Sequence, residues 1–173
     1  MKYNFDNVPS RENSACYKYD YRNEVFGRAD VIPMWIADMD FEVAPCISDA
    51  IKRRTEHALY GYEFRTDAYY NSIINWIARR SKWEVKREWV DFIPGVVPGL
   101  VFAVRALTKP GDGVIIQPPV YPPFAGTITS NGRVVVNNPL RKTDAGFEVD
   151  FDDLDKKLES AKVLMLFPPH TPT

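Results

Sequence analysis

The chain has 173 residues, a length that suits one ordinary domain. Hydrophobic residues make up 45% and charged residues 26%, a composition that excludes global disorder. The net charge of -1 argues against a nucleic-acid protein that relies on bulk basic charge. No apolar run is long enough to span a bilayer, and no apolar secretion signal opens the chain, so we expect a cytoplasmic protein.

The first half of the chain predicts an arm followed by two helices. Residues 1–33 show no sustained period and are expected to be extended. Pro45 suits the first turn of a helix, and Ile47, Ala50 and Ile51 recur there at helical spacing. The next helix is predicted from Asp67, as N-cap, to about Lys82.

The second half alternates between strand-like and helix-like segments. Helices are predicted at residues 98–107 and from Asp150 onward. Short apolar runs, separated by proline and glycine, predict strands at residues 90–93, 114–117, 134–136 and 162–167. Continuous rather than alternating apolar strands indicate an α/β fold with a mostly parallel sheet.

Two segments that follow predicted strands are candidates for ligand binding. Residues 93–99 combine a strand end, a glycine turn and a helix N-terminus, where free backbone N–H groups favour an anion such as phosphate. The alternative is a tight connection without a ligand. Prolines flank Tyr121, which would hold its ring for stacking on a planar ligand or simply pack it in a rigid loop.

Other polar residues have weaker patterns. Asp38 and Asp40 suggest acid–base or metal chemistry, but capping or loop hydrogen bonding is favoured because no third ligand is near. Tyr62 lies between two predicted helices, where its phenol either donates to a phosphate or packs. His57 is expected at the surface. Cys16 and Cys46 are too few for a disulfide scaffold and lack metal-ligand spacing.

Taken together, these segments resemble the N-terminal part of a fold-type-I pyridoxal 5'-phosphate (PLP) enzyme of the aminotransferase class I/II superfamily. Within it, the chain is similar to the MalY/PatB-type cystathionine β-lyases. The resemblance rests on six segments in the family's order: residues 34–41, 44–45, 60–62, 95–99, 119–124 and 169–173. It implies the aspartate aminotransferase-type large domain. Residues 1–45 would form the N-terminal arm and first segment, and residues 46–173 the first part of that PLP-binding domain.

The resemblance also implies roles for individual residues. The backbone from Gly95 through Val96 and Val97 would hold the PLP phosphate, and Tyr121 would stack on the pyridine ring. Tyr62 would reach the phosphate of the neighbouring subunit in a homodimer. Ile36, Ala37 and Asp38 would lie near the carboxylate of a small amino-acid substrate. The implied reaction is β-elimination from L-cystathionine or a similar conjugate, which gives a thiol, pyruvate and ammonia.

The chain departs from the family pattern near residue 170. Pro168 and Thr171 stand where the family has asparagines, and the second of these contacts the phenolic oxygen of PLP. The Schiff-base lysine, the aspartate that pairs with the pyridine nitrogen and the substrate arginine come later in the family. We therefore expect an inactive, poorly stable fragment. Transamination, or a non-catalytic phosphate-ligand or association module, are the alternatives. The strand at 90–93 and those at 114–117 and 162–167 would be separated in the sheet by strands outside the chain.

Overall fold

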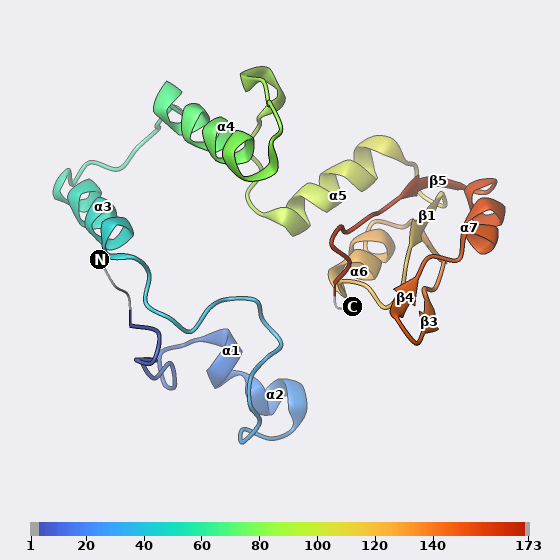
Figure 1. Cartoon of the computed structure of the whole chain (residues 1–173), viewed down its shortest axis with the longest axis horizontal. Helices are drawn as coiled ribbons and strands as arrows, with labels where there is room; N and C mark the ends of the chain where they lie inside the picture. Colours follow the sequence, from blue (N-terminus) through green and yellow to red (C-terminus); the bar gives the residue numbers. More distant parts are fainter. Residues whose placement is uncertain (1–3, 172–173) are drawn as a thin grey trace. The chain divides into compact units, whose positions relative to one another are not determined.

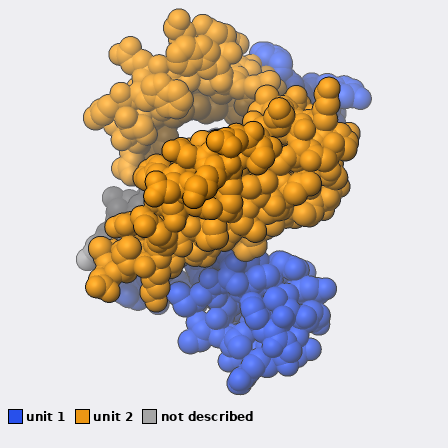
Figure 2. All heavy atoms as spheres, turned by 90° about the vertical axis from the view of Figure 1, so that its right-hand side faces the viewer, with its two compact units in different colours: residues 1–64 blue, residues 65–173 orange. Residues whose placement is uncertain are grey.

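The computed structural model describes residues 4–171, and the chain divides into two units, residues 1–64 and residues 65–173. Figure 1 traces the elements in chain order, and Figure 2 shows the two units in different colours. Unit 1 denotes residues 1–64 below, and unit 2 denotes residues 65–173.

Unit 1 contains helices joined by long irregular segments. They are α1 (Tyr17–Asp20), α2 (Arg22–Phe26) and α3 (Pro45–Glu56). The prediction that residues 1–33 are extended throughout was wrong, because α1 and α2 form there. These two helices have four and five residues, which is too short to produce a periodic pattern in the sequence. The predicted helix at Pro45 is confirmed, with the proline in its first turn.

Unit 2 opens with helical elements. They are α4 (Asp67–Ser81), the 3-10 helix η1 (Arg87–Trp89) and α5 (Val96–Leu107). The N-cap of α4 is Thr66 rather than the predicted Asp67, and its hydroxyl accepts a hydrogen bond from the N–H of Tyr69. The strand predicted at residues 90–93 is absent. A strand needs a neighbour to pair with, and no described segment pairs with these residues.

The rest of unit 2 is built on a parallel sheet and a hairpin. The sheet strands are β1 (Gly113–Ile116), β2 (Val134–Asn137) and β5 (Ala161–Leu164), and β3 (Arg141–Thr143) pairs antiparallel with β4 (Gly146–Glu148). The helices here are α6 (Pro123–Thr129) and α7 (Phe151–Leu158). The predicted parallel α/β arrangement is thereby confirmed for this part of the chain.

The strand order in the sheet is β2-β1-β5, with β1 paired in parallel to both neighbours. The expectation that strands outside the chain separate the strand at 114–117 from that at 162–167 was therefore wrong, because β1 and β5 pair directly. Val114 aligns with Val163, and Ile115 with Leu164. Both edges of β1 are therefore paired, and both of its faces are covered, since Val114, Ile115 and Ile116 alternate between the faces and are at most 3% exposed.

The core of unit 2 lies between β1 and the helices α5 and α6. It contains Val104 from α5, Val114 and Ile116 from β1, and Phe124 and Ile128 from α6, all at most 3% exposed. Leu100, Tyr121 and Phe167 pack against this cluster from its periphery. Since α5 returns to β1 through a short connection, its N-terminus lies toward the carboxyl ends of the strands (Figure 1).

Candidate functional site

The N-terminus of α5 presents free backbone donors. Gly95 precedes the helix with φ of 113°, a conformation that is strained for any side chain, so glycine is required there. The first backbone bond of the helix runs from the N–H of Gly99 to the carbonyl of Gly95, at 3.2 Å. Val96 and Val97 therefore lie in the first turn, where N–H groups have no acceptor within the helix. Pro98, the next residue, has no backbone N–H. Both valines are exposed, so these amides can reach an anion.

Tyr121 is held at the carboxyl end of β1. Its ring stacks on that of Phe167 at 5.7 Å and meets the ring of Phe124 edge-on at 6.0 Å. Beside it lies a groove of about 530 Å³ with mostly apolar walls. The groove is lined by Ile116, Pro118, Pro119, Val120, Tyr121, Pro122, Ala125, Val135 and Asn137. The side chain is half-buried, so the loop fixes the ring while leaving part of it accessible.

The segment after β5 is tied to the segment after β1. Nε2 of His170 lies 2.8 Å from the carbonyl oxygen of Pro119. Thr171 follows directly, and its hydroxyl donates to the carbonyl of Pro169 at 3.4 Å. The structure thus brings the segment of Thr171 to the Tyr121 loop, which follows the carboxyl end of β1, and α5, which directly precedes β1, begins toward that same end.

The remaining predicted site residues belong to unit 1. Tyr62 is fully exposed in the segment between α3 and α4. Ile36 is half-buried, whereas Ala37 and Asp38 are exposed. The structure therefore places these four residues and the α5–Tyr121 site in different units.

Asp38 and Asp40 form a cluster with two cations. Arg11 pairs with both carboxylates, at 2.7 Å to Oδ1 of Asp40, and Nζ of Lys18 lies 2.9 Å from Oδ2 of Asp40. The hydrogen bond from Lys18, followed by that from Arg11, holds the pKa of Asp40 below its ordinary value. The hydrogen bond to Asp40 in turn raises the pKa of Lys18. The structure shows both carboxylates in ion pairs with these cations, and no group of three or more metal-ligating side chains occurs among residues 4–171.

A buried polar network, which the sequence pattern did not reveal, joins the ends of β1 and β2 to α7. Asn138 is fully buried; it accepts from Nε2 of Gln117 at 2.9 Å and donates to Asp153 at 2.8 Å. Lys157 pairs with Asp153 at 2.7 Å, and this contact, followed by that of Asn138, lowers the pKa of Asp153. Gln117 and Asn138 directly follow β1 and β2, and this position at the carboxyl ends of parallel strands is the signal that could have identified them.

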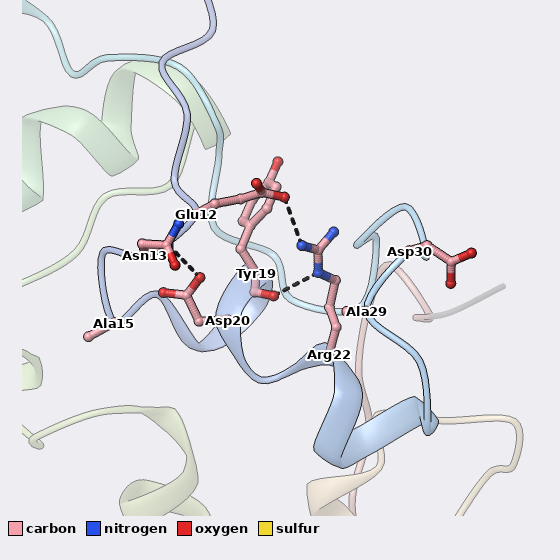
Figure 3. A pocket seen from close by; sticks show the side chains of 8 residues that line it. All are labelled: Glu12, Asn13, Ala15, Tyr19, Asp20, Arg22, Ala29 and Asp30. Atoms are coloured by element: carbon pink, nitrogen blue, oxygen red, sulfur yellow. Dashed lines mark hydrogen bonds and ion pairs between the residues drawn. The ribbon is translucent and has the colours of Figure 1, made fainter.

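Unit 1 has a polar pocket of about 810 Å³, shown in Figure 3. It is lined by Glu12, Asn13, Ala15, Tyr19, Asp20, Arg22, Ala29 and Asp30. Arg22 donates to Glu12 at 2.9 Å and to the carbonyl of Tyr19 at 2.7 Å, and Asp20 accepts from the N–H of Asn13 at 2.8 Å. The charged side chains of this pocket are thus already paired, and Asp30 pairs with Arg28 outside it. No helix formed by the described residues is long and apolar enough to cross a membrane.

Comparison with known proteins places this site in context. Over 172 residues the chain is 40% identical to the cystathionine beta-lyase PatB of Bacillus subtilis, covering 98% of this chain and 44% of PatB. A PLP-bound protein of Clostridium difficile, described as an aminotransferase, superposes with a TM-score of 0.93 at 40% identity, covering 99% of this chain and 44% of that one. Cystalysin of Treponema denticola, which contains PLP, superposes with a TM-score of 0.91 at 33% identity, covering 99% and 45%.

The chain thus spans less than half the length of the relatives that it matches. The sequence model of the family named Aminotransferase class I and II matches residues 29–173, which is most of the chain. That match takes in the N-terminus of α5, the Tyr121 loop and the segment after β5. This chain therefore belongs to the aminotransferase class I and II family of PLP-dependent enzymes.

Proposed function

We propose that this chain provides the phosphate- and ring-binding part of a PLP-dependent C–S β-lyase of the cystathionine β-lyase type. The observation that carries the proposal is the free amide pair of Val96 and Val97, which opens at the same end of unit 2 as Tyr121. The 40% identity to the B. subtilis lyase supports the choice of reaction. The donor set fits the cofactor, since backbone N–H groups at a helix N-terminus suit a phosphate and a fixed ring suits a planar heterocycle.

Each proposed role follows from the position of the residue. Val96 and Val97 donate to the phosphate, and Gly95 gives the backbone the turn that aims these amides. Tyr121 stacks on the pyridine ring, held from behind by Phe167. Thr171 provides a hydroxyl at the phenolic oxygen of PLP, in the position where the family has an asparagine side chain.

The remaining proposed roles belong to residues of unit 1. Ile36, Ala37 and Asp38 lie along the substrate carboxylate, and Tyr62 donates to the phosphate held by a second copy of the chain. The exposure of the Tyr62 phenol suits a contact with another subunit, because it has no packing role within this chain.

When bound, PLP supplies an electron sink for loss of the Cα proton and departure of a thiol from Cβ. This chain's part is to bind the phosphate, fix the plane of the ring and exclude water from one of its faces with Tyr121 and Phe167.

No lysine lines the groove beside Tyr121. We therefore expect the 173 residues by themselves to hold PLP without a covalent anchor and to release no thiol from L-cystathionine above the free-PLP background. A thiol assay with added PLP measures this, and release above that background would contradict the expectation.

Binding of PLP tests the proposed phosphate site directly. Val97→Pro removes one donor at a first-turn position that tolerates proline, and should weaken PLP binding by about tenfold or more, as expected for loss of a charge-assisted hydrogen bond. Val97→Ala keeps the N–H and is the matched control. Calorimetry with PLP, repeated with inorganic phosphate, measures both variants after circular dichroism has shown that they are folded. Equal affinity in the two variants would place the phosphate elsewhere.

A chimera tests the reaction. In it, residues 1–173 replace the matching 44% of PatB, so that the remainder of the lyase supplies the groups this chain does not have. We expect the PLP-loaded chimera to release thiol and pyruvate from L-cystathionine. A chimera that binds PLP but turns over no substrate would instead support a non-catalytic phosphate-ligand or association module.

Transamination is the second candidate, favoured by the C. difficile aminotransferase, with its TM-score of 0.93. The same chimera separates the two reactions by product. β-Elimination breaks the C–S bond and yields a free thiol, whereas transamination leaves the thioether intact in a 2-oxo acid. Retention of the C–S bond with consumption of the amino group would overturn the lyase proposal.

We also propose a cytoplasmic homodimer. Large apolar side chains such as Trp76 (56%), Phe102 (54%) and Leu107 (66%) are exposed on α4 and α5, and exposed apolar surface of this kind drives association. Sedimentation velocity of the 173 residues should show concentration-dependent association. A monodisperse monomer that melts cooperatively above about 60 °C, the upper range for mesophile domains, would contradict both the dimer and the expected low stability.

A further inference from the structure

The loop proposed to face the substrate carboxylate carries two negative charges of its own. The loop comprises residues 36–40, and its charges are those of Asp38 and Asp40. These two carboxylates would repel the carboxylate of a substrate, since like charges at close range disfavour one another. The loop can accept an anion only where these charges are compensated.

Lys18 provides one of the compensating charges. Its side chain is only 7% exposed, and among residues 4–64 no other residue is buried. Nζ donates to Oδ2 of Asp40 at 2.9 Å and to the backbone carbonyl of Asp38 at 2.9 Å, and lies 3.7 Å from Oδ1 of Asp38. The backbone carbonyl of Lys18 in turn accepts from Nε1 of Trp35 at 3.1 Å. Lys18 therefore contacts the loop at both of its ends.

Arg11 provides the second charge from a different part of the arm. One Nη atom donates to Oδ1 of Asp40 at 2.7 Å and to the carbonyl of Met39 at 3.4 Å, and the other pairs with Asp38. Its guanidinium also lies over the ring of Tyr19, 5.6 Å from the centroid, which holds it in place. Two cations thus meet two carboxylates, and the cluster has no net charge.

We propose that Lys18, together with Arg11, is a positioning residue that fixes residues 36–40 and cancels the charges of Asp38 and Asp40, so that the loop can accept the substrate carboxylate. The inference rests on the role proposed above for Ile36, Ala37 and Asp38. Lys18 suits the task because a buried ammonium without partners is strongly disfavoured, so the cluster forms with its carboxylates or not at all.

Limited proteolysis of the full chain tests the positioning. Thermolysin, which cuts before large apolar residues, has targets at Ile36 and Met39 within the loop and at Phe41 directly after it. Lys18→Met should raise the cleavage rate there by about tenfold, because cleavage follows the population of the open loop. Lys52→Met, on exposed α3, is the matched control and should change nothing.

A double variant separates charge compensation from packing. Lys18→Met/Asp40→Asn has a neutral cluster again, and its loop should be cleaved within about threefold of the unsubstituted rate, since the unpaired charge is gone. Lys18→Arg should behave likewise. Fast cleavage in the double variant would overturn charge compensation. An equal rise in cleavage throughout α1, α2 and the loop would make Lys18 a residue of general stability and overturn the positioning role.

Chemical labelling gives a second, independent measurement. Lys18 should be acetylated at least about tenfold more slowly than exposed Lys52, since the rate follows the fraction of time that the amine is free. Asp40→Asn should raise the labelling of Lys18, whereas Asp49→Asn on α3 should not. Equal labelling of Lys18 and Lys52 in the unsubstituted chain would overturn the cluster. Neither experiment uses PLP, so failure here leaves the phosphate site intact, and failure of PLP binding leaves this inference intact.

Discussion

The two units of this chain are stabilised by different interactions. Unit 2 encloses Val114, Ile115 and Ile128, which have no exposed surface. In the described part of unit 1, the one buried side chain is a lysine, and its large apolar side chains, such as Met34 and Ile51, remain open to solvent. Apolar burial is insensitive to charge, whereas ion pairs depend on the ionisation of each partner. The unit that holds the proposed cofactor site is thus the one with the rigid core, and the unit proposed to meet the substrate depends on electrostatics.

The largest expected difference between the units comes from truncating an isoleucine side chain to alanine in each of them. Ile128→Ala leaves a cavity in the unit 2 core and should reduce the free energy of unfolding by about 3 kcal/mol. Ile51→Ala, at a side chain that is 60% exposed in α3, should change it by less than about 0.5 kcal/mol. Urea titration followed by circular dichroism measures both. Similar losses for the two variants would mean that unit 1 has a core of its own.

Acid should loosen unit 1 before unit 2. Lys18, followed by Arg11, lowers the pKa of Asp40, so its ionised form contributes stability that is fully present above the ordinary pKa of 3.8. That contribution is lost as the pH falls below 3.8 and passes through the lowered pKa of Asp40. Pepsin, which is active at low pH, should therefore cut residues 34–41 at a rate that rises by about tenfold across this range, while β1 stays intact.

Substitution of the carboxyl group is the control for the acid experiment. Asp40→Asn should make cleavage of residues 34–41 fast already at the upper end of this pH range, because the carboxylate that pairs with both Lys18 and Arg11 is gone. Cleavage of β1 before residues 34–41 in the unsubstituted chain would reverse the proposed order of stability. Asp153 in unit 2 also has a lowered pKa, but the apolar core next to α7 does not titrate.

The smallest expected effect concerns helix caps. The carboxylate of Asp150 accepts from the N–H of Asp153 at 3.0 Å at the start of α7, so Asp150→Ala should reduce stability by about 1 kcal/mol. The N-cap of α3 in unit 1 is Ala44, which has no side-chain acceptor. Ala44→Ser should therefore increase the helicity of α3, with a gain of at most about 1 kcal/mol. Urea midpoints and circular dichroism measure the pair, and a stabilising Asp150→Ala would contradict the cap.

Local signals were sufficient to predict the long helices and the buried strands. The helix from residue 67 was predicted to within a residue at each end, and β1 to within one residue, because apolar periodicity and caps act over a few positions. Helix α6 was not predicted, since Pro122 and Pro123 indicate a stiff loop although proline is tolerated in a first helical turn. The β3–β4 hairpin was missed because strands of three residues show no clear alternation.

The features that required tertiary structure were those with distant partners. The segment at residues 90–93 has β-branched and aromatic side chains, but strand formation depends on a neighbour that propensity cannot reveal. Asp38 and Asp40 were recognised as a pair, yet their cations lie 20 to 29 residues away along the chain, beyond any local spacing rule. The free amides of Val96 and Val97, in contrast, follow from a glycine turn and a helix start that are contiguous in sequence.

The order β2-β1-β5 has a consequence for how the chain folds during synthesis. The central strand finds its first partner, β2, soon after it is made, but its second partner, β5, ends at Leu164. At about 5–20 residues per second, the interval between completion of β1 and completion of β5 is roughly 2 to 10 s. Throughout that interval one edge of an otherwise finished apolar strand is unpaired on the ribosome, and it is this edge that a chaperone would have to shield.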